Sequence, residues 1–327
     1  MSKSSNLTIG VYTSGGDAPG MNAAIRAVVR SGIDRSYRVV GVLEGYRGMI
    51  DGQFKELTMN SMANIIQRGG TVLKTGRSPE FLRSDIRKRA ATHLKQAGID
   101  ALVCIGGDGS FAGAHALAED HKIPIIGIPA TIDNDIFGTD ATIGFDTAVN
   151  TALSAIDRIR DTAASHNRLF IVEVMGKASG FIATHVGLAG GAEGIFIPEI
   201  KTSIESVINH MNQGIQRGKR SSILVIAEGE KPGSAYDLAD QLKTKAGVEA
   251  KVCILGHIQR GGSPTAIDRI LASRLGAGAV EALANGKSNL MVGIQNEKLT
   301  HVPLADSVRG QKEIDKNLID LSQILSK

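Results

Sequence analysis

Short apolar runs that end in glycine-rich turns recur along this chain and limit its fold more than any other feature. The run Ala101–Ile105 shows the pattern, because it leads directly into Gly106-Gly-Asp-Gly-Ser110. Segments with helical spacing separate such runs, as in Thr147–Thr162, where apolar residues recur every three or four positions. Strands that alternate with helices predict an α/β fold with mainly parallel sheets and helices on both faces.

The alternation restarts near Phe145, so we predict two doubly wound domains. A length of 327 residues also favours two domains over one. The larger domain is expected to comprise residues 1–144 and 259–309, and the smaller one residues 145–258 and 310–327. In such sheets ligands bind at the carboxyl ends of the strands, which is where the glycine-rich turns fall.

The predicted elements follow this alternation along the whole chain. Strands are expected at 7–12, 39–43, 101–105, 124–128, 169–174, 194–197, 223–227, 252–255 and 290–294, with a further glycine-bounded strand just before Arg77. Helices are expected at 21–31, 86–96, 111–119, 147–162, 268–284 and 314–325, with others near Phe181, Ile204 and Tyr236.

Charge and composition narrow the possible partners. The formal charge is +4, but the basic residues are scattered and only 4% of residues are aromatic, which argues against nucleic acid. We interpret the positive net charge as serving the binding of anionic small molecules.

No segment approaches the length of a membrane span, so we expect a cytoplasmic protein without membrane contact. Cys104 and Cys253 lie in apolar runs and are expected to be buried, reduced thiols.

Two glycine-rich turns have the composition of phosphate-binding loops. The segments Thr13–Gly20 and Gly106–Ser110 each follow a predicted strand and precede a predicted helix. Glycine lets the main chain approach a phosphate closely, and the free N–H groups of the following helix favour an anion. Asp108 would repel a bare phosphate but suits a magnesium ion that the phosphates also bind. A plain strand-to-helix connection explains one such turn, whereas two favour phosphate.

A third turn carries a pair of carboxylates. Asp133 and Asp135 lie two residues apart after the strand 124–128, so in an extended segment they would face the same side. One can serve as a general base, and the other can position metal or water. An aspartate after a strand is more often a turn residue, but Thr131, which can bond phosphate, favours a catalytic pair. Phosphate loops beside such a pair predict phosphoryl transfer.

Two further clusters favour a sugar phosphate. His257 and Arg260 follow a strand in a glycine-flanked loop, and imidazole with guanidinium suits a phosphate dianion. Glu228, at the end of the strand 223–227, is placed to accept hydrogen bonds from sugar hydroxyls, although a surface carboxylate remains the alternative.

Five blocks spread over nearly the whole chain carry a resemblance. In order they are Thr13–Asn22, Gly106–Ser110, Pro129–Asp135, Met175-Gly176 and Gly256–Ser263. Their sequence and order resemble the bacterial ATP-dependent 6-phosphofructokinases. The resemblance implies transfer of the γ-phosphoryl group of MgATP to the 1-hydroxyl of fructose 6-phosphate, the committed step of glycolysis. It also implies an active site in the cleft between the two domains.

The resemblance assigns roles to residues that match the family's motifs. Asp133 is implied to be the general base, supported by Thr131, Asp135 and Lys177, and Asp108 is implied to hold Mg²⁺. The implied ATP-binding residues are Gly16, Tyr46, Arg77, Ser78, Gly107, Asp108, Gly109, Ser110 and Gly113. The implied fructose 6-phosphate residues are Thr131, Asp133, Arg168, Met175, Gly176, Lys177, Glu228, Lys251, His257 and Arg260.

Departures from the family pattern bear on kinetics and on the donor. Lys177 and Lys251 stand where the family has arginines, which keeps the charge but loses bidentate geometry. Pyrophosphate-dependent relatives carry aspartate where this chain has Gly109 and lysine where it has Ala130, so the resemblance favours ATP as the donor.

The resemblance further implies a homotetramer with shared sites and an effector site for ADP and phosphoenolpyruvate. The matching effector residues are Arg26, Arg30, Met59, Arg160, Gly191, Glu193, Arg217, Lys219 and Arg220. Met59 replaces a basic residue of the family, which predicts altered regulation.

Two other functions fit parts of the pattern. A kinase that phosphorylates a lipid or NAD would also carry Gly-Gly-Asp-Gly, but the blocks at 131–135 and 257–260 argue against it. A non-catalytic sensor of nucleotides or sugar phosphates would have no need of Asp108, Asp133 and Asp135 together.

Overall fold

The protein folds as two compact α/β units. The structure, a computed structural model, describes residues 7–76, 78–166, 168–201, 203–218, 221–229 and 232–326. The larger unit comprises Met1–Asp146 and Arg260–Lys312, and the smaller unit comprises Thr147–Gln259 and Glu313–Lys327. Our sequence prediction placed the three crossings at 144, 258 and 309. The predicted α/β class with mainly parallel sheets is confirmed.

The larger unit is built on a twisted sheet whose central strands are parallel. Among the described residues this sheet has seven strands in the order β11-β10-β5-β4-β1-β2-β3. Their bounds are β1 (Thr8–Thr13), β2 (Arg38–Val42), β3 (Phe54–Glu56), β4 (Ala101–Gly106), β5 (Ile125–Pro129), β10 (Leu290–Gln295) and β11 (Lys298–Pro303). Of the strands described, only β3 and β11, at the two edges, pair antiparallel to their neighbours. Strands β1, β4 and β5 are buried at every residue, as expected for central strands covered on both faces.

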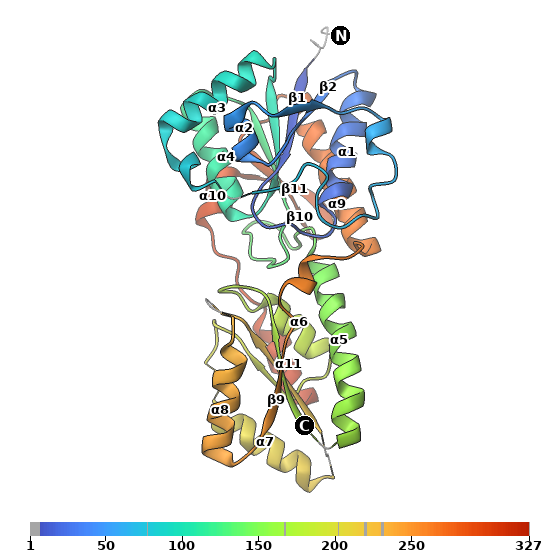
Figure 1. The fold of residues 1–327 in the computed structure, drawn as a ribbon, viewed down its shortest axis with the longest axis vertical. Coiled ribbons are helices and arrows are strands. Elements are labelled where there is room, and N and C mark those ends of the chain that lie inside the picture. The colour runs from blue at the N-terminus through green and yellow to red at the C-terminus, as the bar shows by residue number, and fades with distance from the viewer. Residues whose placement is uncertain are drawn as a thin grey trace. The chain divides into compact units, whose positions relative to one another are not determined.

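Helices cover both faces of this sheet (Figure 1). Helices α1 (Met21–Asp34) and α9 (Ala266–Ala284) pack together on one face. The other face carries α2 (Tyr46–Asp51), α3 (Ser84–Gln96), α4 (Asp108–His121) and α10 (Leu304–Arg309), and Phe111, Leu117 and Leu304 join the core there. Two 3₁₀ turns, η1 (Asn60–Met62) and η2 (Pro79–Leu82), lie in the connections.

The smaller unit repeats the plan with a four-stranded parallel sheet in the described residues, ordered β7-β8-β6-β9. Its strands are β6 (Leu169–Val174), β7 (Gly194–Phe196), β8 (Ser222–Ala227) and β9 (Ala250–Ile254). Its helices are α5 (Phe145–His166), α6 (Phe181–Ala189), α7 (Ile204–Gln216), α8 (Ser234–Ala246) and α11 (Lys316–Leu325), and η3 (Gly256–Arg260) follows β9. Side chains of α7 and α8 form a core with β6 and β8 that includes Met211, Leu224 and Leu238.

Two sequence predictions are wrong in the larger unit. The expected strand before Arg77 is absent from the described residues 69–76, which form turns instead, and Lys74 has a left-handed φ of 59°. The side chains that favoured a strand bind the first glycine turn: Thr75 Oγ1 donates to the Gly15 carbonyl at 2.9 Å. Arg77 itself lies outside the described residues. Helix α4 begins at Asp108 rather than at the predicted residue 111, with Gly107 as its N-cap.

The two cysteines differ in burial. Cys104 is fully buried, and burial raises the pKa of its thiol to about 12. Cys253 is only partly buried, contrary to the prediction, because β9 is an edge strand of the smaller sheet. Over the described residues, every helix is too short or too polar to cross a membrane.

Candidate active site

Three loops of the larger unit lie side by side because they follow neighbouring parallel strands. Strand β4 lies between β1 and β5, so the loops after Thr13, Gly106 and Pro129 emerge at one edge of the sheet. Backbone hydrogen bonds join them: Ser14 N donates to Ile105 O at 3.1 Å, and Ala130 N donates to Gly106 O at 2.9 Å. The sequence therefore brings both phosphate loops and the carboxylate loop together.

The loop after β4 has the form of a phosphate cradle. A Cβ at Gly106 would lie 2.5 Å from Ser110 Oγ and 2.6 Å from Ser14 O, so only glycine fits there. The next turn begins α4, whose first N–H groups have no partner within the helix. Ser110 Oγ is buried and has no hydrogen-bond partner among the described residues. The backbone amides and this hydroxyl together suit an anion such as a phosphate.

Asp108 fits a magnesium ion that is shared with phosphates. It lies exposed in the first turn of α4, beside the cradle. The described residues contain no group of three or more His, Cys, Asp or Glu side chains that would hold a metal without help. A single carboxylate is the usual protein contribution to Mg²⁺ that takes its other ligands from phosphates and water.

The carboxylate loop is held by Asn134 rather than extended as predicted. Asn134 has a left-handed φ of 53°, and its Oδ1 accepts from Thr142 N at 3.0 Å. Thr142 Oγ1 also donates to Thr131 O at 2.6 Å, which closes the loop on itself. The premise that Asp133 and Asp135 share one side of an extended segment is therefore wrong. Asp133 is fully buried, and its N–H donates to Thr131 Oγ1 at 3.2 Å.

Lys312 is a cation beside this loop that the sequence did not reveal. Its Nζ donates to the carbonyl of Asp140 at 2.9 Å, the same oxygen that Asn134 Nδ2 approaches at 3.4 Å. Burial lowers the pKa of Lys312 to about 8, and the negative charges of Asp140 and Asp135 oppose the shift only in part. Lys312 is the last residue of the larger unit before the chain enters the smaller one.

The shifted pKa of Lys312 predicts how stability depends on pH. Below about pH 8 the native and the unfolded chain both carry the proton, so this group adds no slope. Between about pH 8 and the ordinary value of 10.5 the unfolded chain keeps more protons, and the free energy of unfolding should therefore rise with pH. Denaturant unfolding at several pH values should show that Lys312→Met loses this rise. Parallel curves for the two proteins would contradict it.

Tyr46 is the central residue of a buried aromatic cluster, formed with Tyr12 and Phe81, beside the cradle. Its hydroxyl donates to the carbonyl of Ser110 and accepts from Tyr12 Oη at 3.2 Å. Its ring stacks on Phe81, with centroids 4.0 Å apart and planes at 26°. A Cβ at Gly113 would lie 2.8 Å from the Tyr46 hydroxyl. Three residues predicted to bind the nucleotide, Tyr46, Ser110 and Gly113, are thus in contact.

The first glycine turn carries a guanidinium. Arg260 Nη1 donates to Asp17 O at 3.1 Å, and a Cβ at Gly16 would lie 2.6 Å from the same nitrogen. Arg260, predicted for the sugar phosphate, is therefore placed against Gly16, predicted for ATP. Its positive charge would suit an anion bound at the carboxyl ends of these strands.

In the smaller unit, the loop after β6 carries Met175, Gly176 and Lys177 of the predicted sugar-phosphate residues. Gly176 and Lys177 have φ values of 145° and 51°. Lys177 N donates to Glu228 Oε1 at 3.1 Å, so two predicted residues are brought together. Met175 N donates to Oε1 of Gln259 at 2.9 Å, and Gln259 is fully buried. Gln259 was not predicted, because its neighbours His257 and Arg260 carry the charge signal.

The remaining predicted substrate and nucleotide residues are mostly exposed. Arg168, Lys251 and His257 are exposed in the smaller unit, and Ser78 is partly buried before η2 in the larger one. Arg168 precedes β6 and Lys251 lies in β9, the strand paired with β6, so these two cations lie near the amino ends of neighbouring parallel strands. Exposed cations at strand ends are available to an anionic ligand.

The predicted effector residues fall into two groups. Arg26 and Arg30 lie on α1, which contacts η1, and Met59 is the exposed residue before η1. In the smaller unit, Arg160 Nη2 donates to the carbonyl of Gly191 at 3.1 Å, Arg217 is exposed and Glu193 accepts a hydrogen bond from Ile223 N. Lys219 and Arg220 lie outside the described residues.

Comparison with known proteins identifies relatives of the whole chain. Residues 8–283 match the family model described as phosphofructokinase. An ATP-dependent 6-phosphofructokinase 1 of Thermus thermophilus is 57% identical over 318 residues, which cover 97% of this chain and 99% of that protein. The ATP-dependent 6-phosphofructokinase of Halalkalibacterium halodurans is 52% identical with the same coverage.

Solved structures agree in fold. The phosphofructokinase of Pichia pastoris in the T-state superposes with a TM-score of 0.87 at 36% identity, covering 94% of this chain. This chain spans only 36% of the Pichia chain. A pyrophosphate-dependent phosphofructokinase of Marinobacter aquaeolei has a TM-score of 0.83 and covers 98% of this chain and 91% of its own, but at 23% identity it shows the shared fold alone.

Proposed function

The chain belongs to the phosphofructokinase family, and we propose that it is an ATP-dependent 6-phosphofructokinase whose general base is Asp133. It transfers the γ-phosphoryl group of ATP to the 1-hydroxyl of fructose 6-phosphate, giving fructose 1,6-bisphosphate and ADP in glycolysis. The observation that carries this proposal is the placement of the Gly106 cradle and the Asp133 loop on neighbouring strands, joined by the Ala130 N to Gly106 O bond.

Catalysis in this proposal is positioning and charge neutralisation, as phosphoryl transfer requires. The cradle and the N-terminus of α4 hold the phosphates, with Ser110 Oγ as an added donor. Asp133 accepts the proton of the 1-hydroxyl as the bond to phosphorus forms, and the hydrogen bonds of Thr131 and Asn134 keep its loop in place. Asp135 lies in the same loop, where its carboxylate can position metal or water beside Asp133. Magnesium held by Asp108 would neutralise charge on the β- and γ-phosphates.

The smaller unit supplies the sugar-phosphate residues in this proposal. His257 and Arg260 hold the 6-phosphate together with Arg168 and Lys251 of a neighbouring subunit, and Glu228 orients the sugar with Met175 and Gly176. Lys177 places a positive charge at the transferring group. Lysine is a flexible point charge, whereas arginine would bind two oxygens at once, so we expect activity with altered kinetics.

The donor in this proposal is ATP rather than pyrophosphate. Gly109 is exposed in the first turn of α4 and a Cβ there would meet nothing within 4 Å, so the space beside the cradle is open to a nucleotide. Ala130 places no positive charge at the end of β5.

We further propose that the enzyme works in the cytoplasm as a homotetramer whose subunits share active and effector sites. In that assembly Arg168 and Lys251 reach the substrate of a neighbouring subunit. ADP and phosphoenolpyruvate act at the effector residues, and Met59 weakens that site because it removes a positive charge.

A comparison of donors tests the proposed function. Coupled turnover of fructose 6-phosphate with magnesium is expected with ATP and at background level with pyrophosphate. Turnover with pyrophosphate alone would contradict the role assigned to Gly109 and Ala130. Tight binding of fructose 6-phosphate without turnover with either donor would contradict the enzymatic function and favour a non-catalytic sensor of sugar phosphates.

A further inference from the structure

A buried carboxylate lies near the end of β6, the strand between β8 and β9 in the smaller sheet. Glu173 is 1% exposed and is paired in register with Ile226 of β8. A carboxylate is costly to bury unless hydrogen-bond donors surround it. The donors around Glu173 therefore indicate what this residue does.

Those donors belong to the first turn of α8. Gly233 N donates to Glu173 Oε1 at 2.8 Å, and Ala235 N donates to Oε2 at 2.9 Å. Ser234 Oγ lies 3.3 Å from Oε2 and 3.2 Å from the carbonyl oxygen of Ala227. The N-cap of α8 is Gly233, which has no side chain that could satisfy these groups. Glu173 takes the place of the missing cap, and its negative charge suits the positive end of a helix.

This cap fixes one end of the connection that carries Glu228. Strand β8 ends at Ala227, and Glu228 N donates to the carbonyl of Val174 at 2.9 Å. At the other end of the connection, Gly233 N donates to the Glu173 side chain. Consecutive residues of β6 thus hold both described ends of the connection between β8 and α8.

Glu228 contacts the loop that follows β6. It is 9% exposed, and its Oε1 accepts from Lys177 N at 3.1 Å. The same loop carries Met175 and Gly176, so the strand end that caps α8 leads directly into residues predicted to bind the sugar. A shift of the α8 N-terminus would therefore move the Glu228 carboxylate against that loop.

We propose that Glu173 is a positioning residue for fructose 6-phosphate: it fastens the connection between β8 and α8 and so holds the Glu228 carboxylate in the orientation that meets the sugar. Glu173 does not touch the sugar, because it is buried and its two oxygens face the α8 turn. The inference rests on the proposed function, which assigns Glu228 to the sugar hydroxyls.

Glu173→Gln tests this role, because glutamine keeps the shape but loses the charge and turns an N–H₂ group toward N–H donors. We expect the KM for fructose 6-phosphate to rise roughly tenfold, as when one binding group is displaced by a fraction of an ångström. The KM for ATP and kcat should stay within about twofold, since the cradle and the Asp133 loop belong to the larger unit. Calorimetric titration with fructose 6-phosphate alone should show the same loss without requiring turnover.

A double-mutant cycle distinguishes positioning from a general loosening of the fold. Glu228→Gln alone should weaken the binding of fructose 6-phosphate. Adding Glu173→Gln to it should cause no further loss, because the two residues act through one contact with the sugar. Losses that multiply in the double variant, or an unchanged KM in Glu173→Gln, would overturn the proposal.

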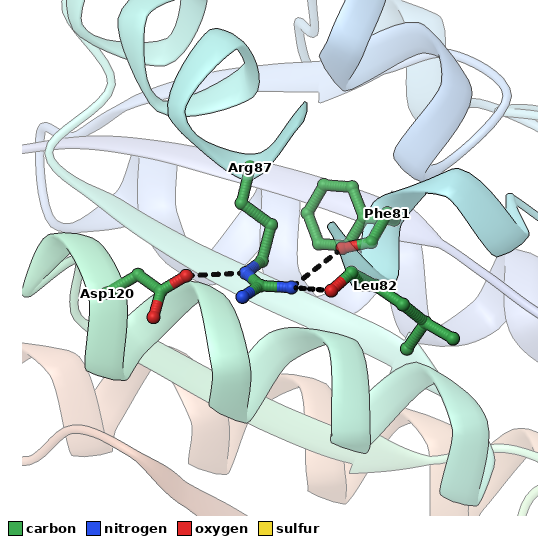
Figure 2. Close-up of polar contacts among 4 residues, drawn as sticks. All are labelled: Phe81, Leu82, Arg87 and Asp120. Carbon is green, nitrogen blue, oxygen red and sulfur yellow. Dashed lines mark hydrogen bonds and ion pairs between the residues drawn. The ribbon is translucent and has the colours of Figure 1, made fainter. Parts of the chain in front are cut away.

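Two controls remove a carboxylate elsewhere. Asp237→Asn takes an exposed charge from the same first turn of α8 and should leave the KM for fructose 6-phosphate unchanged. Asp120→Asn weakens a mostly buried ion pair of the larger unit, in which Arg87 Nε donates to Asp120 Oδ2 at 2.7 Å and Nη1 donates to two carbonyls of η2 (Figure 2). It should lower the melting temperature without raising this KM. A rise in either control that equals the rise in Glu173→Gln would overturn the proposal.

A second variant serves if Glu173→Gln does not fold. Gly233 has a φ of 108°, and a Cβ there would meet nothing within 4 Å. Gly233→Ala therefore strains the turn at the cap without filling occupied space. It should raise the KM for fructose 6-phosphate roughly threefold, and an unchanged KM would contradict the role of Glu173.

The outcomes also separate this proposal from the proposed function. A wild-type protein that neither binds nor phosphorylates fructose 6-phosphate would contradict the function and this inference with it. A wild-type protein that does both, with an unchanged response in Glu173→Gln, would contradict the positioning role alone.

Discussion

Replacement of Asp133 by asparagine is expected to lower kcat by roughly 10²–10⁴-fold, because the hydroxyl of the sugar loses its proton acceptor. Asparagine has nearly the same shape, so the hydrogen bond from residue 133 N to Thr131 Oγ1 and the Asn134 contacts should persist. The KM values for ATP and fructose 6-phosphate should change by only a few fold. Steady-state turnover at saturating substrates is the measurement.

Two controls belong with this variant. Its melting temperature should match that of the wild type, and Asp306→Asn, an exposed carboxylate on α10, should leave kcat unchanged. If kcat of Asp133→Asn stays within about threefold of the wild type, Asp133 is not the general base, because loss of a general base lowers the rate far more than that.

Gly109→Asp is expected to lower kcat/KM for ATP by roughly 10²-fold or more, because a carboxylate next to the cradle repels the phosphates and occupies the space of the nucleotide. The structure makes this variant informative, since a Cβ at Gly109 would meet nothing within 4 Å and the chain there is exposed. The fold should therefore be unchanged, and the loss should appear in Mg·ADP binding as well as in turnover.

The matched control is Gly109→Ala, which adds the Cβ without the charge. We expect Gly109→Ala to keep kcat/KM for ATP within about tenfold, because a methyl group neither repels phosphate nor reaches far. A kcat/KM for ATP in Gly109→Asp equal to that of the wild type would mean that the bound nucleotide does not lie next to residue 109. Gain of turnover with pyrophosphate would strengthen the assignment.

The sheets and the phosphate loops were predictable because their signals are local. Apolar runs such as Ala101–Ile105 that end in glycine define both a buried strand and the turn after it. Parallel strands then bring their carboxyl ends to one edge, so the Gly106 and Asp133 loops became neighbours without any knowledge of distant contacts. Helix ends were less accurate: α4 starts at Asp108 rather than at the predicted residue 111, because Gly107 already takes the non-helical N-cap conformation.

Features that depend on contacts between distant residues were not predictable. Asn134 adopts a left-handed conformation because Thr142 and Asp140, six to eight residues away, hold its side chain. Arg87 and Asp120 lie 33 residues apart, and each alone looks like an ordinary surface charge. Lys312 comes from the far end of the sequence to reach Asp140. A weak signal did exist for Gln259, since it lies between two predicted ligands, but its role is to hold Met175 N.

The central claim is that the chain moves the γ-phosphoryl group of ATP to the 1-hydroxyl of fructose 6-phosphate. Phosphorus NMR of a mixture of enzyme, magnesium, ATP and fructose 6-phosphate tests it directly, because it identifies every product. The account predicts fructose 1,6-bisphosphate and ADP in equal amounts, with no free phosphate. Free phosphate with intact fructose 6-phosphate, or a phosphoryl group at another position of the sugar, would contradict it.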